Sequence, residues 1–123
     1  TTGAATVSGA VGTDIGTVTV TQSGGTTFSS PIVTTTVTLT ATTGTIIFNG
    51  TLSITTLNTA NAGYNVAING GGTITNAATF SNTGTLTLAG TTAFTAGVTA
   101  TSPTTIYLAE LHLQPQPNLR FCK

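Results

Sequence analysis

Charged side chains are almost absent from this 123-residue chain, which has two basic and two acidic residues and a formal net charge of zero. Asp14 is the only charged residue before Glu110. Nucleic-acid-binding proteins neutralise phosphates with clustered Lys and Arg, so we expect no nucleic-acid partner. Soluble monomers usually carry a net charge that keeps copies apart. The composition therefore favours a protein that is assembled with other copies, glycosylated or anchored in something larger.

Cysteine and long apolar runs are also scarce. The single cysteine, Cys122, cannot form an internal disulfide, so we consider it a candidate for an intermolecular one. The longest apolar runs are short, such as Ile46–Phe48, and lie far below the roughly 20 residues of a membrane helix. No initiator Met and no signal peptide are visible. A secreted protein whose leader has been removed fits these features, and we expect an extracellular location without a membrane span.

The scarcity of acidic residues argues against catalysis and against bound metals. Asp14 and Glu110 are the only carboxylates, whereas hydrolases on parallel β-helices need clustered ones. Glu110 and His112 would share one face of a strand, but a zinc site needs about four ligands, and we interpret the pair as a solvated polar face. Gly70–Gly72 is not followed by the Lys of a phosphate-binding loop. We therefore expect no enzyme, no cofactor and no metal.

Threonine is the residue that the chain has in excess, with 34 copies. Thr is β-branched and suits the pleated surface of a sheet. It alternates with aliphatic residues in segments such as 17–21, 36–40, 51–55, 73–75 and 85–88. Alternation with period two places the aliphatic side chains on one face of a strand and the hydroxyls on the other. Gly- and Asn-rich turns separate these segments, and we predict an all-β fold.

Two architectures compete within that class. The pairs Val66/Ile68, Leu86/Leu88 and Ile106/Leu108 follow one another at 20-residue intervals, which favours a β-solenoid, that is, a parallel β-helix. The step from Leu39 to Val66 breaks this period and predicts an extra or irregular coil.

The alternative is an antiparallel β-sandwich or jelly roll completed by strands from neighbouring subunits. Its best support is Phe48-Asn49-Gly50-Thr51, which lies between two apolar segments and is typical of a hairpin. We favour the solenoid over the sandwich.

The segments Gly72–Asn76 and Phe80–Leu88 resemble the repeats of bacterial autotransporter passengers and filamentous-haemagglutinin-type adhesins. The resemblance covers about residues 16–100 and is compositional. It implies a right-handed parallel β-helix on the cell exterior. It carries over no catalytic residue.

The chain divides into a Thr-rich β domain, residues 1–102, and a C-terminal segment, residues 103–123. The second part holds a further strand around Ile106–Leu108 and a tail with Pro115 and Pro117, which stop a central strand. Asn49-Gly50-Thr51 also matches the N-glycosylation pattern, so Asn49 is a candidate glycan acceptor.

Three functions fit these patterns. The first is a structural subunit of a self-assembling extracellular filament or cell-surface layer, because unguarded strand edges pair with other copies and residues 16–100 hold no Lys and a single proline, Pro31. The second is a fragment of a surface adhesin that binds host or surface glycans. The third and least favoured is an ice-binding protein, since Thr-X-Thr rows look like those of insect antifreeze proteins, which differ in being rich in disulfides.

Overall fold

The protein is described by a computed structural model that covers residues 3–108 and the backbone of residues 119–121. The described residues form strands and no helix. Sheet A contains β1 (Ala5–Val7), β3 (Thr26–Phe28), β5 (Thr45–Phe48), β7 (Asn65–Ile68), β10 (Thr85–Leu88) and β13 (Thr105–Leu108). Sheet B contains β2 (Thr17–Val20), β4 (Ile32–Leu39), β6 (Leu52–Thr59), β8 (Gly72–Ile74) and β11 (Thr92–Phe94). Sheet C contains β9 (Ala78–Thr79), β12 (Val98–Ala100) and β14 (Leu119–Phe121).

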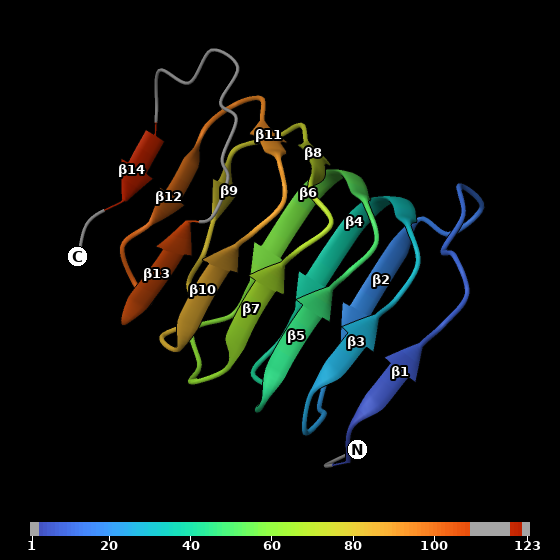
Figure 1. Cartoon of the computed structure of the whole chain (residues 1–123), viewed down its shortest axis with the longest axis horizontal. Helices are drawn as coiled ribbons and strands as arrows, with labels where there is room; N and C mark the ends of the chain where they lie inside the picture. Colours follow the sequence, from blue (N-terminus) through green and yellow to red (C-terminus); the bar gives the residue numbers. More distant parts are fainter. Residues whose placement is uncertain (1–2, 109–118, 122–123) are drawn as a thin grey trace.

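Every strand pair among these residues is parallel, and successive coils stack in register. Leu86 pairs with Val66 on one side and with Ile106 on the other, 20 positions away in each direction. Figure 1 shows the strands of sheet A side by side as one layer, with sheets B and C behind it and the two termini at opposite ends of the stack. The chain is a β-solenoid of about five turns, as the 20-residue interval predicts.

The alternation of hydroxyl and aliphatic residues sets which side chains fill the solenoid. In β5, β7 and β10 each second side chain is buried, and these buried side chains are aliphatic or aromatic. They form columns along the axis, one of which runs through Phe28, Phe48, Ile68 and Leu88. The Phe28 and Phe48 rings stack with centroids 5.2 Å apart. Each coil therefore supplies the apolar neighbours of the next.

The long strands β4 and β6 each turn a corner in mid-strand. Two consecutive residues that are not fully buried, Thr35-Thr36 in β4 and Thr55-Thr56 in β6, interrupt the alternation. Inward side chains resume on either side of each Thr pair, so the strand bends and keeps its apolar side toward the core. Sheet C lies beside the second half of β6, where the Thr59 hydroxyl donates to the Thr79 carbonyl at 2.7 Å. The coil is thus three-sided.

The Asn49-Gly50 corner corrects the hairpin prediction. Asn49 and Gly50 join β5 to β6, which belong to different sheets. The corner is narrow because successive coils touch there: a Cβ on Gly70 would lie 2.4 Å from the Gly50 carbonyl oxygen. The tight turn that the dipeptide favours is present, but β5 and β6 pair with strands of neighbouring coils and not with each other. The antiparallel sandwich is excluded by the same parallel pairing.

The prediction of an extra or irregular coil is also wrong. Leu39 pairs with Thr59, and Val66 pairs with Ile46, so the interval of 20 residues continues through the middle of the chain. The error arose because Leu39 and Val66 lie in different sheets of the coil. At the C-terminal end, β13 is the strand expected around Ile106–Leu108. The hydroxyl and aliphatic alternation stops before β14, so nothing in the sequence predicts that strand.

Candidate functional site

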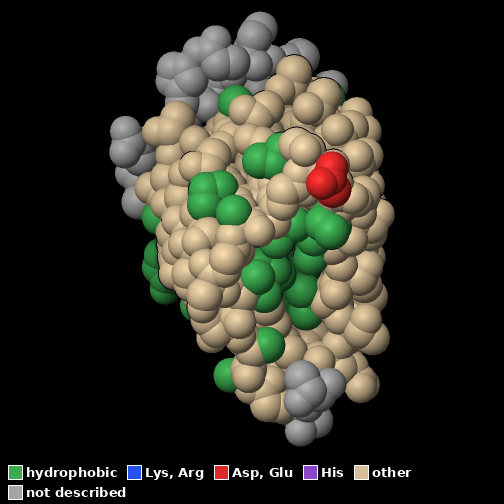
Figure 2. Space-filling view, turned by 90° about the vertical axis from the view of Figure 1, so that its right-hand side faces the viewer, with side chains coloured by type: hydrophobic (Ala, Val, Ile, Leu, Met, Phe, Trp, Pro, Cys, Tyr) green, Lys and Arg blue, Asp and Glu red, His purple; other side chains and the backbone are tan. Residues whose placement is uncertain are grey.

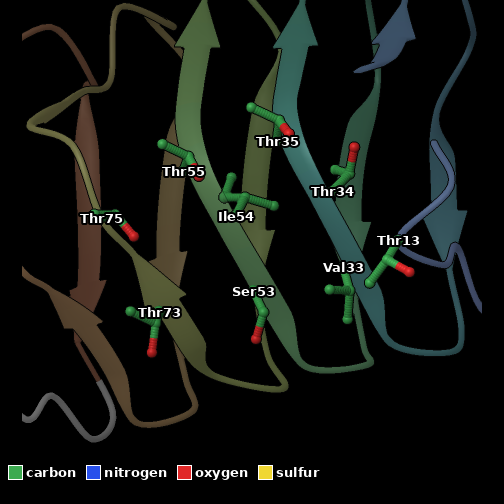
Figure 3. Close-up of a pocket in the computed structure, with 9 residues that line it drawn as sticks. All are labelled: Thr13, Val33, Thr34, Thr35, Ser53, Ile54, Thr55, Thr73 and Thr75. Atoms are coloured by element: carbon green, nitrogen blue, oxygen red, sulfur yellow. The ribbon is translucent and has the colours of Figure 1, made fainter. Parts of the chain in front are cut away.

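Two surfaces of the solenoid stand out, and the first is a groove on its side. It has a volume of about 410 Å³ and is lined by Thr13, Val33, Thr34, Thr35, Ser53, Ile54, Thr55, Thr73 and Thr75. Figure 3 shows that these side chains come from β4, β6, β8 and the residue after it, Thr75, and from the loop that carries Thr13. Seven of the nine carry a hydroxyl. The groove can therefore donate and accept many hydrogen bonds.

The register of the coils builds the groove. Val33, Ser53 and Thr73 pair in successive strands and form one outward column. Two positions later come Thr35 in β4, Thr55 in β6 and Thr75, which directly follows β8. The Thr13 loop is held against β4, because the Thr34 hydroxyl donates to the Ile15 carbonyl. None of the lining residues titrates near neutral pH, so the groove suits a neutral ligand with hydroxyl groups.

The second surface is the N-terminal end of the solenoid, where the first coil has a neighbour on one side only. In the described part of the chain, β1 pairs with β3 alone and β2 with β4 alone. Val7, Val11 and Val18 pack against the core but stay partly exposed, and Ile15 is 46% exposed. Figure 2 views this end and shows hydrophobic side chains gathered in its middle, with one acidic side chain near them. Asp14 is the only acidic residue among those described.

The free backbone groups of β1 follow from its hydrogen bonds to β3. The Ala5 N–H donates to the Gly25 carbonyl at 2.9 Å, and the Ser29 N–H donates to the Val7 carbonyl at 2.9 Å. Backbone groups of a strand point to alternate sides, so the N–H and C=O of Thr6 point away from β3. Thr6 therefore carries a donor and an acceptor at the open edge of sheet A.

The candidate residues from the sequence fall in different places. Asn49 lies exposed at the corner after β5, and its Oδ1 accepts a hydrogen bond of 3.0 Å from Asn69 Nδ2. Glycan attachment at Asn49 stays a prediction. Cys122, Glu110 and His112 lie outside the described residues. In the part of the chain that is described, no three His, Cys, Asp or Glu residues gather, and no helix is long and apolar enough to cross a membrane.

Several polar contacts between coils escaped the sequence analysis, although their spacing signals them. Asn side chains donate to a residue 20 positions earlier in pairs such as Asn65 with Thr45 and Asn76 with Thr56. Tyr64 is fully buried and donates to the Ala60 carbonyl at 2.9 Å. Burial raises the pKa of Tyr64 above its ordinary value of 10.0, and hydrogen bonds to Thr59 and Ala60 oppose this rise.

Comparisons of this chain with models of known families, with curated proteins and with solved structures gave no match. The two surfaces described above are therefore the features of this protein that bear on its function.

Proposed function

We propose that this protein is a structural subunit of an extracellular assembly, in which copies join through the ends of the solenoid. The observation that carries this proposal is the apolar and unpaired N-terminal end. Val7, Val11 and Val18 offer partly exposed apolar surface there, and Thr6 offers an unpaired donor and acceptor. A second copy that covers this end buries both kinds of group at once.

The side chains of β1 include no Lys, no Pro and no inward-pointing charge. Natural proteins block exposed edges with Lys, Pro or inward-pointing charge. β1 reads Ala-Thr-Val, and Asp14 is the only ionic side chain of the first coil. Two copies that approach through this end therefore meet little electrostatic repulsion. A location outside the cell belongs to the same proposal, and it is supported by the resemblance of residues 16–100 to the repeats of bacterial surface proteins.

The test compares two variants of one residue. Thr6→Pro removes the N–H of β1 that points away from β3 and keeps the groups of Ala5 and Val7 that bond the next coil, whereas Thr6→Ala keeps that N–H. Sedimentation velocity and negative-stain electron microscopy over a concentration series would measure particle length. We expect parent and Thr6→Ala particles to lengthen with concentration, and Thr6→Pro particles to need at least tenfold more protein. Parent protein that stays monomeric throughout would contradict the proposal.

A second candidate function is adhesion, and the side groove is the observation that favours it. Its hydroxyl-rich and uncharged lining suits a neutral saccharide, which would compete with water for the Thr and Ser groups. A glycan array of the parent protein, repeated with Ser53→Val and Thr55→Val, provides the measurement. We expect any bound glycan to lose at least tenfold in affinity in these variants. If both variants bind the glycan as the parent does, the glycan site lies outside the groove.

A further inference from the structure

We infer that the copies associate head to tail, with β13 of one copy pairing in parallel with β1 of the next, Ile106 opposite Ala5 and Leu108 opposite Val7. This inference rests on the proposed function and specifies its interface. It is carried by three features of the described residues: the direction of the free backbone groups, the inward columns and the exposure of the last strand.

The free backbone groups at the two ends are complementary. Within sheet A, hydrogen bonds between coils follow one rule: the N–H after an inward residue donates to the inward residue of the previous coil. Asn49 N–H donates to the Phe28 carbonyl, Asn69 N–H to the Phe48 carbonyl and Ala89 N–H to the Ile68 carbonyl.

The same rule applies at the last strand. Because Leu108 pairs with Leu88 as Leu88 pairs with Ile68, the backbone groups of Ile106 and Leu108 point away from β10. Thr6 is the residue of β1 whose backbone N–H and C=O point away from β3, toward the open edge of sheet A. In the inferred register the Thr6 N–H donates to Ile106 and the Leu108 N–H donates to Thr6, so the sheet continues without a break.

The inward column continues in the same register. Val7 is paired with Phe28 at the start of the column that ends in Leu88 and Leu108. Leu88 is fully buried between two coils, whereas Leu108, in the coil that contains β13, is 46% exposed. Val7 of the next copy would cover Leu108 as each coil covers the one before it. Slippage by one residue would turn every inward side chain outward, and slippage by two would leave one inward pair between β1 and β13 in place of two, so the columns favour this register.

Pairing of β13 with β1 of the next copy leaves β1 free at one end of the joined copies and β13 free at the other. Such heterologous contacts give open filaments, whereas pairing of β1 with β1 around a two-fold axis stops at a dimer. The two ends favour the open form, because head-to-tail pairing covers both the β1 edge and the 46% exposed Leu108, whereas a β1–β1 dimer would leave Leu108 uncovered. The partner is therefore a second copy of this chain in the same orientation.

The polarity can be tested by cross-linking single-cysteine proteins in a Cys122→Ser background. Thr6 and Tyr107 are outward neighbours in the inferred register, and both are exposed, Tyr107 by 59%. Neighbouring strands lie about 4.8 Å apart, which is within the Cα separation that a disulfide spans. Mixing Thr6→Cys protein with Tyr107→Cys protein under mild oxidation should give the mixed dimer as the main product, at least fivefold above either homodimer.

Two controls distinguish a wrong register from a lack of self-association. Thr27→Cys replaces Thr6→Cys in one mixture, because Thr27 lies on the same outward face between β1 and β5 and has no open edge beside it. A short bis-maleimide reagent repeats each mixture without a requirement for disulfide geometry. A predominant Thr6–Thr6 homodimer would overturn the head-to-tail register while leaving self-association in place. An absence of every cross-link, together with monomeric sedimentation of the parent, would overturn the proposed function itself.

Discussion

Phe48 and Val7 belong to the same column of inward side chains, yet they have different surroundings. Phe48 is 1% exposed, since Phe28 lies on one side of it and Ile68 on the other. Val7 has Phe28 on one side and stays partly exposed on the other. The first coil repeats the local pattern of the interior coils but lacks half of their contacts. Position in the stack therefore decides how much each repeated residue stabilises the fold.

The largest expected effect comes from truncating one residue in each region of this column. Phe48→Ala should lower the free energy of unfolding by about 3–5 kcal/mol, because it leaves a cavity between two coils. Val7→Ala should lower it by about 1 kcal/mol, since solvent already reaches this side chain and few atoms are removed. Urea denaturation followed by circular dichroism measures both. Equal losses in the two variants would show that the first coil is packed as tightly as the interior.

A smaller effect is expected at the corner where interior coils touch. Gly70→Ala places a Cβ 2.4 Å from the Gly50 carbonyl oxygen, and backbone must shift to make room. The free energy of unfolding should fall by roughly 1–3 kcal/mol, as in other overpacked sites. Gly63→Ala is the matched control, because a Cβ there meets nothing within 4 Å. A control that destabilises as much as Gly70→Ala would refute the steric explanation.

Tyr64 tests a buried polar contact of the interior. Tyr64→Phe removes the hydrogen bond to the Ala60 carbonyl and should cost about 1 kcal/mol of stability. The raised pKa of Tyr64 also predicts a pH dependence. The unfolded chain releases the phenol proton first once the pH passes about 10. The contribution of Tyr64 is therefore complete below that pH and is lost as the pH rises through the folded-state pKa.

Unfolding curves recorded on either side of pH 10 would measure this loss. The Tyr64→Phe protein should lack the part of the decline that Tyr64 causes. Identical pH profiles for the two proteins would count against a buried phenol at this position.

The smallest effect is expected for contacts on the outside of the corners. Asn69 Nδ2 donates to Asn49 Oδ1 at 3.0 Å, but both residues are exposed and water can replace either partner. Asn69→Ala should therefore change the free energy of unfolding by no more than about 0.5 kcal/mol. Thermal unfolding monitored by calorimetry is sensitive enough to detect this. A loss as large as that of Tyr64→Phe would mean that the exposed Asn pairs, and not the core alone, hold interior coils together.

The candidate surfaces were only partly predictable from the sequence. The scarcity of charge and the unguarded strands of residues 16–100 predict self-association, but they do not single out Thr6 and Val7, which lie outside that range. The groove could not be found in this way, because Val33, Ser53 and Thr73 are 20 residues apart and become neighbours only when coils stack. The bend at Thr35-Thr36 and Thr55-Thr56 was available as a signal, since consecutive Thr residues interrupt the alternation at equal spacing.

The sequence by itself determined which side chains face inward, because period-two alternation is a local property of an extended backbone. It also determined the 20-residue repeat and the near absence of charge, with Asp14 as the single ionic side chain of the first coil. Only the tertiary structure decided which strands pair, and so whether Asn49-Gly50 is a hairpin or a corner. Backbone donors and acceptors are the same in every strand, so pairing is chosen by the packing of whole coils, in which the columns from Phe28 to Leu88 are filled together.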